Sequence, residues 1–228
     1  MIEAMNVERI LSVEDRARKH AALADPVRVR MLDLLTFGDL TPTVLREELG
    51  LPSNLVAHHL GVLEREGIIT RTRSEGDGRR SYVRLNPGAL PQLGSFAVAG
   101  AVRVVFVCSQ NSARSQLARA LWAEVSAVPA ESAGTHPAAR VAAGAVATAA
   151  RHGLDLTGAS PQLVDEIVND TDLVITVCDR AREEYPGGTV HWSIPDPVRV
   201  GTDAAFDAAF DDLAGRINQL APRILAVA

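Results

Sequence analysis

The segment from Cys108 to Ser115 holds the residues best suited to chemistry. It reads Cys-Ser-Gln-Asn-Ser-Ala-Arg-Ser, so five residues separate Cys108 from Arg114, and a serine follows the arginine. A loop of this length can wrap a tetrahedral oxyanion with backbone N–H groups while the arginine holds two of its oxygens. A positive environment also favours thiolate, the nucleophilic form of cysteine. The spacing therefore predicts a cysteine nucleophile in an anion-binding loop.

The flanking residues place this loop between a strand and a helix. The β-branched, apolar run VRVVFV (residues 102–107) precedes Cys108, and QLARALWAEVS follows with helical character. The positive end of that helix would add to anion binding. Ser115 is placed to donate a hydrogen bond to the thiolate, and Asn111 to brace the loop. The residues expected to surround the oxyanion are Ser109, Gln110, Asn111, Ser112, Ala113 and Arg114.

Three further segments follow in order: SAGT at 132–135, then DLVITVCDRA, then HWSIPDP. With the loop, they resemble the low-molecular-weight phosphatase superfamily, which includes tyrosine phosphatases and arsenate reductases. The resemblance implies a three-layer α/β/α domain with a short parallel sheet over residues 102–228. The chain is then expected to end in an amphipathic helix from about Ala204 to Val227. The resemblance also implies that Asp196 is the acid that protonates the departing oxygen. The family loop often has glycine where this chain has Gln110, which puts the detailed shape of the anion-binding loop in doubt.

The segments NSARSQLARAL and VITVCDRAREEYP and the pair His191-Trp192 are similar to the arsenate reductase branch. Tyrosines that often follow the acid in tyrosine phosphatases are missing, because Asp196-Pro197 runs into Val-Arg-Val. The resemblance therefore favours a thiol-dependent arsenate reductase, with a protein-tyrosine phosphatase as the alternative. Arsenate reduction needs a second thiol to attack the first.

Cys178 is the candidate for that second thiol. It ends an apolar run beside the strand that delivers Cys108, and ligand sites of open α/β sheets lie at the carboxyl edge. A buried, inert core thiol is the other interpretation. Thioredoxin-coupled relatives have a third cysteine where this chain has Tyr185. An external thiol must then complete the cycle, from thioredoxin, mycothiol with mycoredoxin, or glutathione with glutaredoxin; no tightly bound cofactor is expected.

Residues 1–86 follow another pattern. Apolar residues recur at helical spacing from Val7 to about Ala24, and caps or prolines start further helices at Asp25-Pro26, at Thr41-Pro42 and near Asn54. After Gly67 come IITRTR, SEGDG and RRSYVRL, which predict a hairpin. Short helices followed by a hairpin predict a winged helix-turn-helix domain. Residues 71–84 carry five arginines against two acidic residues, which suits contact with DNA phosphates.

The stretches ALADPVRVRMLDLL and LREELGLPSNLVAHHLGVLEREGII resemble the ArsR family of winged-helix repressors over residues 8–86. The resemblance implies a homodimer and a palindromic DNA operator. Adjacent histidines point to different sides of a helix and no cysteine precedes position 108, so neither a metal site nor direct arsenite sensing is expected. The DNA-contacting residues implied are Ser53, Asn54, Val56, His58, His59, Arg79 and Arg80.

Composition limits the remaining possibilities. The 228 residues carry a net charge of −5 and are 47% hydrophobic, which is ordinary for a globular protein. No stretch has the roughly 20 apolar residues of a membrane helix, and two cysteines cannot form a disulfide framework, so we expect a cytoplasmic protein. Residues 87–101 read as a linker. The prediction is a DNA-binding repressor fused to an arsenate reductase, with two rivals: a non-catalytic oxyanion sensor and a tyrosine phosphatase carrying its own regulator.

Overall fold

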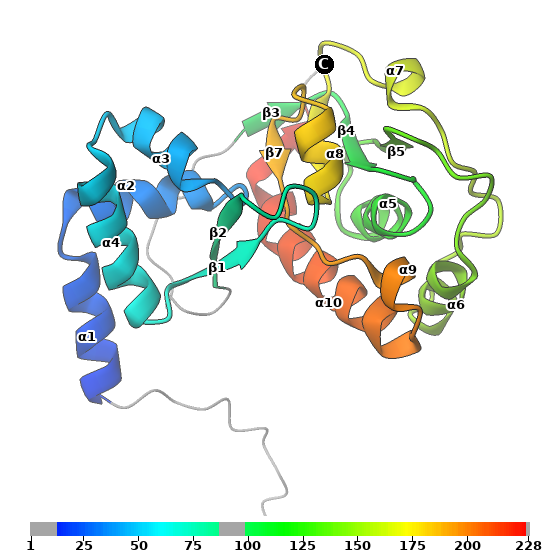
Figure 1. Cartoon of the computed structure of the whole chain (residues 1–228). Coiled ribbons are helices and arrows are strands. Elements are labelled where there is room, and N and C mark those ends of the chain that lie inside the picture. The colour runs from blue at the N-terminus through cyan, green and yellow to red at the C-terminus, as the bar shows by residue number, and fades with distance from the viewer. Residues whose placement is uncertain (1–12, 87–98, 227–228) are drawn as a thin grey trace, which may run out of the picture.

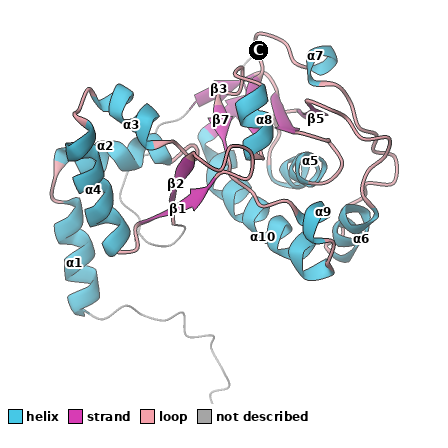
Figure 2. Cartoon of the chain, in the orientation of Figure 1, coloured by secondary structure: helices cyan, strands magenta, loops and turns pink. Residues whose placement is uncertain are grey.

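Two domains lie side by side in the computed structural model, which describes residues 13–86 and 99–226 (Figure 1). The first domain is mainly helical, and the second surrounds a parallel sheet with helices (Figure 2). This arrangement confirms the predicted order of a helix-turn-helix domain followed by an α/β domain. The expected apolar residues Val7, Ile10 and Leu11 and most of the expected linker lie outside the described residues.

Four helices build the first domain. They are α1 (Val13–Leu23), α2 (Pro26–Leu35), α3 (Pro42–Leu49) and α4 (Ser53–Arg65). Asp25 caps α2 by accepting hydrogen bonds from the Val27 and Arg28 backbone N–H groups at 2.9 and 3.1 Å, and the Thr41 hydroxyl caps α3. Gly50 ends α3 at a φ of 64°, a left-handed conformation that glycine adopts without strain. The predicted caps therefore set these helix boundaries.

The hairpin after α4 is the wing. Strands β1 (Ile69–Arg73) and β2 (Ser81–Leu85) pair antiparallel, with Thr70 opposite Arg84. The helices and the base of the hairpin share one apolar core, whose fully buried members include Met31, Leu45, Leu60, Leu63, Ile68 and Val83. The outer end of the wing points away from this core and toward the second domain (Figure 1).

The second domain has a four-stranded parallel sheet in the order β5-β4-β6-β7. The strands are β4 (Val104–Cys108), β5 (Ala130–Gly134), β6 (Leu173–Thr176) and β7 (Val190–His191). The helices are α5 (Arg114–Val125), α6 (Ala143–Arg151), α7 (Val164–Ile167), α8 (Asp179–Glu184), α9 (Pro197–Val200) and α10 (Asp203–Leu220). Every residue of β4 is buried, as expected for the inner strand of a parallel sheet.

The structure differs from the sequence predictions at both ends of this domain. The C-terminal helix was expected to run from about Ala204 to Val227, but α10 ends at Leu220 because Pro222 has no backbone N–H to continue it. A 3-10 turn (Ala221–Arg223) and strand β8 (Ile224–Ala226) follow. Strand β8 pairs in parallel with β3 (Ala99–Ala101), so the end of the expected linker is part of the fold.

The domains are joined by buried polar contacts. Arg216 on α10 forms two hydrogen bonds to Asp39, at 2.9 and 3.1 Å, with both side chains almost fully buried. The Trp192 indole donates to the Phe37 carbonyl at 3.1 Å. A Cβ on Gly38 would lie 2.6 Å from a backbone oxygen of β7, so only glycine fits there. The interface is therefore close-packed.

Candidate active site

A loop between β4 and α5 carries the candidate nucleophile. Cys108 is the last residue of β4, and α5 begins at Arg114. The Cys108 Sγ accepts a hydrogen bond from the Asn111 backbone N–H at 3.1 Å and lies 3.1 Å from the Ser115 Oγ. The loop therefore directs a backbone amide and a serine hydroxyl at the sulfur of the candidate nucleophile.

Asn111 braces this loop from within. It is fully buried with a φ of 48°, a left-handed conformation that asparagine tolerates better than most residues. Its Nδ2 donates to the Ser115 Oγ at 2.8 Å, and its Oδ1 accepts from the Gln116 side chain and the Gln162 backbone. Because the Ser115 oxygen receives this hydrogen bond, its own hydrogen is free to point at the Cys108 sulfur.

The carbonyl groups of the loop are fixed on its outer side. Those of Ser109, Gln110 and Ser112 accept backbone hydrogen bonds of 2.7 to 2.9 Å from residues 136–142. In a trans peptide the following N–H points the opposite way, so the amides turn inward and form an anion-binding nest. Gly134 lies behind the loop, where a Cβ would be 2.9 Å from the Ser109 oxygen. This contact explains the glycine in the SAGT segment.

Arg114 lies inside the site with 6% of its surface exposed. One guanidinium nitrogen donates to the Ile194 carbonyl at 2.9 Å, and the other lies 3.1 Å from the Asp196 carboxylate. Burial alone would lower the pKa of Arg114, but the Cys178 and Cys108 sulfurs and the Asp196 carboxylate raise it above its ordinary value. The arginine is therefore a permanent cation beside both sulfurs and the expected acid.

Cys178 lies against the same loop. It directly precedes α8 and caps it, with its Sγ accepting from the Ala181 backbone N–H at 3.4 Å and from the Ser109 backbone N–H at 3.3 Å. Burial raises the pKa of Cys178, although Arg114 opposes the shift. The Cys178 sulfur must therefore lose two hydrogen bonds before it can act, the one that caps α8 and the one from the loop.

A cavity opens at the loop. It is lined by Glu75, Ser109, Gln110, Arg114, Cys178, Asp179, Arg180, Asp196 and Arg199. Three of these side chains are guanidinium groups and three are carboxylates, and this described lining includes no aromatic or branched aliphatic side chain. Of the two thiols, the one in the lining is that of Cys178. The cavity is suited to a small polar anion.

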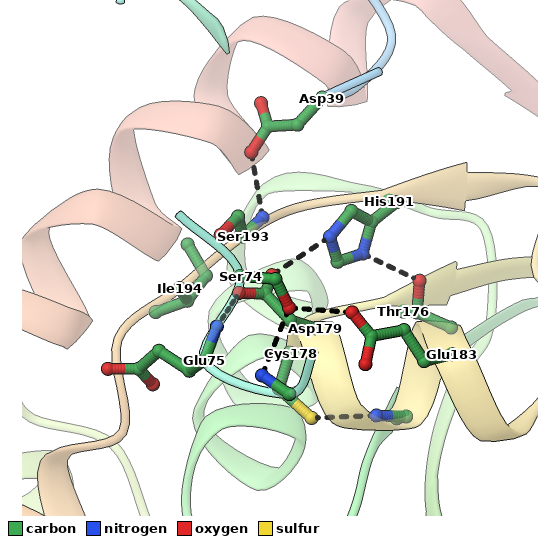
Figure 3. Close-up of polar contacts among 12 residues, drawn as sticks. Asp39, Ser74, Glu75, Thr176, Cys178, Asp179, Glu183, His191, Ser193 and Ile194 are labelled. Carbon is green, nitrogen blue, oxygen red and sulfur yellow. Dashed lines mark hydrogen bonds and ion pairs between the residues drawn. The ribbon is translucent and has the colours of Figure 1, made fainter. Parts of the chain in front are cut away.

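Sequence reasoning missed four of these residues: Glu75, Asp179, Arg180 and Arg199. Asp179 is held by the buried His191, whose Nε2 lies 3.2 Å from its carboxylate, and by the Glu75 backbone N–H at 2.7 Å (Figure 3). Asp179 follows Cys178 in the chain, and that adjacency was the available signal. Nothing in the sequence pointed to Glu75, because it reaches the cavity from the wing of the other domain.

The residues expected to contact DNA divide into two groups. Ser53, Asn54, His58, Arg79 and Arg80 are exposed. Val56 and His59 are 2% and 6% exposed, and the prediction that they face the groove is corrected. The physical reason is helical spacing, because these two residues lie on the face of α4 that also carries Leu60 and Leu63 into the core.

Two absences concern the described residues, 13–86 and 99–226. Within them, no three or more histidine, cysteine or acidic side chains are grouped so that they could hold a metal ion. None of their helices combines the length and apolar character needed to cross a membrane.

Comparison with known proteins identifies both halves. Residues 23–72 match a helix-turn-helix domain, which implies DNA binding. The arsenate reductase of Bacillus subtilis is 29% identical over 137 residues, covering 52% of this chain and 94% of that protein. The arsenate reductase of Brevibacillus brevis is 31% identical over 133 residues, covering 52% and 92%.

A crystal structure of arsenate reductase from Archaeoglobus fulgidus aligns with 30% identity and a TM-score of 0.45, over 52% of this chain and 98% of that one. The model of the low molecular weight phosphotyrosine protein phosphatase family matches residues 103–227, which include the loop, Asp196 and every residue of the cavity lining except Glu75. The chain therefore belongs to the low molecular weight phosphotyrosine protein phosphatase family and carries a helix-turn-helix domain at its N-terminal side.

Proposed function

We propose that the chain is a DNA-binding transcriptional regulator fused to a thiol-dependent arsenate reductase. The observation that carries the reductase assignment is the second thiol. Cys178 lines the cavity, and its sulfur accepts a hydrogen bond from the nucleophile loop itself at Ser109. Hydrolysis of a phosphate ester needs no second thiol, whereas reduction of arsenate does. The described relatives at about 30% identity are arsenate reductases, which agrees with this assignment.

In the mechanism, the Cys108 thiolate attacks arsenic(V) and displaces one oxygen, which leaves as water after receiving a proton from Asp196. The amides of residues 109–114 and the Arg114 guanidinium hold the charge on the remaining oxygens. The Cys178 thiol then loses its proton and attacks the Cys108 sulfur. A disulfide forms, the sulfur–arsenic bond breaks, and its electron pair leaves with arsenic as arsenite. Two external thiol groups, from one dithiol protein or from two small thiols, then return this disulfide to two thiols and become a disulfide themselves.

The alternative activity within the family is hydrolysis of phosphotyrosine. A phenyl ring gains affinity from apolar or aromatic side chains around it. The cavity lining supplies arginines, carboxylates, Ser109, Gln110 and one thiol instead, which favours an inorganic oxyanion. A third possibility is an oxyanion sensor without turnover, for which the loop would bind the anion and Cys108 would not react.

The DNA-binding half is proposed to act as a homodimer on a palindromic site, through Ser53, Asn54 and His58 in the groove and Arg79 and Arg80 on the backbone. These five side chains are exposed. Basic side chains near phosphates release counterions and support affinity, while the α4 residues would read bases.

Arsenate reduction by the purified chain tests the proposal. Arsenite formation is measured with thioredoxin, glutaredoxin and mycothiol systems in turn, and hydrolysis of an aryl phosphate is measured in parallel. The reductase predicts arsenite with at least one donor and little aryl phosphate hydrolysis. Hydrolysis without any arsenite formation would assign a phosphatase, and phosphate binding without either reaction would assign a sensor.

A further inference from the structure

The wing of the helix-turn-helix domain contacts the mouth of the oxyanion cavity. Its loop, Ser74–Arg80, packs on α8 of the other domain, and Ser74 and Glu75 meet the acidic side chains of that helix (Figure 3). The Ser74 hydroxyl and the Asp77 backbone N–H donate to Glu183 at 2.6 and 2.7 Å. The described position of the wing is therefore fixed by several hydrogen bonds rather than by one.

The contact is close at Gly76, where a side chain would have to displace the Glu183 carboxylate. A Cβ on Gly76 would lie 2.3 Å from the Glu183 carboxylate and 3.2 Å from the backbone of Arg180. The turn residue that suits a hairpin thus also suits close approach to α8. Together with the hydrogen bonds, this approach indicates a specific docked state of the wing.

The Glu75 carboxylate reaches into the cavity and is held as an oxyanion would be. One oxygen accepts from the Asp196 backbone N–H at 2.9 Å, and the other accepts from the Arg199 guanidinium at 2.8 Å. A backbone amide and an arginine are the donors that bind anions in such sites. Glu75 therefore occupies anion-binding groups next to the residue proposed as the acid.

The charge of the cavity depends on this residue. With Glu75 in the lining, the three arginines face three carboxylates, so the charges of these side chains cancel. Without it, the same lining has a net charge of +1. A divalent oxyanion at the loop is repelled by Glu75 while the wing is docked and would be attracted if Glu75 were neutral or absent.

We infer that Glu75 is a specificity-determining residue of the oxyanion site, contributed by the DNA-binding domain, and that it sets the site's affinity for small tetrahedral dianions. Oxyanion binding and docking of the wing oppose each other through the same carboxylate. By thermodynamic reciprocity, an anion at the loop weakens wing docking by the factor by which docking weakens the anion. The inference rests on the proposed function only in that the Cys108 loop binds an oxyanion.

Inorganic phosphate is the probe, because it is not reduced and needs no thiol. Its affinity is measured by calorimetry on the full chain for the wild type, Glu75→Gln and Asp77→Asn. Asp77→Asn is the matched control, since it removes one negative charge from the same loop at a residue outside the cavity lining. Removing one unit charge near a dianion in a partly buried site predicts about tenfold tighter binding for Glu75→Gln and less than twofold change for Asp77→Asn.

Hydrogen exchange provides an independent readout of docking. The Glu75 and Asp77 amides donate to α8, so saturating phosphate should speed their exchange in the wild type and speed it less in Glu75→Gln. Equal phosphate affinity in the wild type and Glu75→Gln, or slower wing exchange with phosphate, would overturn the inference. An Arg114→Ala variant distinguishes failure of the inference from failure of the proposed anion site. If neither Arg114→Ala nor Glu75→Gln changes phosphate affinity, the loop is not the site and the inference falls with it. If Arg114→Ala abolishes binding but Glu75→Gln does not change it, the inference alone is refuted.

Discussion

Cys178 has a structural and a proposed chemical role, and two substitutions separate them. The sulfur caps α8 by accepting from the Ala181 backbone N–H, and it accepts from Ser109 on the loop. Cys178→Ser keeps an acceptor at that position, and serine is a preferred capping residue. Cys178→Ala removes both the acceptor and the thiol. Neither variant can form the proposed disulfide with Cys108.

The structural cost follows from the cap. Losing a capping acceptor costs about 1 kcal/mol, which is roughly a fivefold change in the ratio of folded to unfolded protein. For a chain of this size that corresponds to a fall in Tm of about 2 to 4 °C, expected for Cys178→Ala. Cys178→Ser should stay closer to the wild type. The two variants thus differ in stability but share one chemical defect.

The chemical defect is measured as arsenite formation with the donor that supports the wild type. Both variants should lose at least about a hundredfold in turnover, because no second thiol attacks the Cys108 sulfur to release arsenite. Any aryl phosphate hydrolysis of the wild type should persist in Cys178→Ser. Turnover of arsenate by Cys178→Ser at the wild-type rate would refute the reasoning, and mass spectrometry would then find an external thiol on Cys108 and no internal disulfide.

Four other predictions follow. Cys108→Ser should abolish oxyanion turnover but retain phosphate binding by calorimetry, because the amides and Arg114 remain. Arg79→Ala with Arg80→Ala should flatten the salt dependence of DNA binding by up to about 2 in log–log slope, measured by titration at several salt concentrations. Asp39→Ala removes one of the two carboxylate partners of the buried Arg216, leaving Asp212, and should lower the free energy of unfolding by about 3 kcal/mol in urea denaturation. In the wild type, ionised Asp179 should add to the free energy of unfolding above the ordinary carboxyl pKa of 3.8, and this contribution should be lost as the pH falls below it. Asp179→Asn should lack this contribution, which acid titrations followed by circular dichroism measure.

The sign of that last prediction comes from the surroundings of Asp179. Burial alone would raise the pKa of this carboxyl, but hydrogen bonds, led by that from His191, hold it below its usual value. A depressed folded-state pKa means that the ionised form stabilises the fold, so protonation at low pH removes that stabilisation. A wild type and Asp179→Asn with parallel stability curves between pH 5 and pH 2 would contradict this account.

Much of the fold could be predicted because local chemistry fixes it. The caps at Asp25 and Thr41 start helices at the expected residues, and the β-branched run before Cys108 is the central strand. The C-terminal helix was predicted too long because its apolar spacing continues past Leu220, although Pro222 ends it. Strand β8 pairs with residues of the expected linker, and such non-local pairing leaves no periodic signal in so short a segment.

The candidate site divides in the same way. The sequence predicted the loop and Arg114 because a strand–loop–helix unit is encoded locally. Asp196 came from the family resemblance, and its carboxylate lies 3.1 Å from the Arg114 guanidinium. The resemblance to winged-helix repressors assigned Val56 and His59 to DNA, and such a resemblance does not show which face of this helix is buried. Their burial was decided by packing against α2 and the wing.

Contacts between domains leave the weakest trace in a sequence. Glu75 lies more than thirty positions before the nucleophile, inside a hairpin loop whose acidic and glycine residues would suit any exposed turn. In the folded chain the backbone of this loop donates hydrogen bonds to Asp179 and Glu183. The Glu75 side chain accepts from the Asp196 backbone N–H and from the Arg199 guanidinium. In the docked wing, the backbone amides of Glu75 and Asp77 donate hydrogen bonds to the second domain. These hydrogen bonds must break before the same loop can contact DNA. The balance between the docked wing and the DNA-bound wing therefore depends on the charge in the cavity.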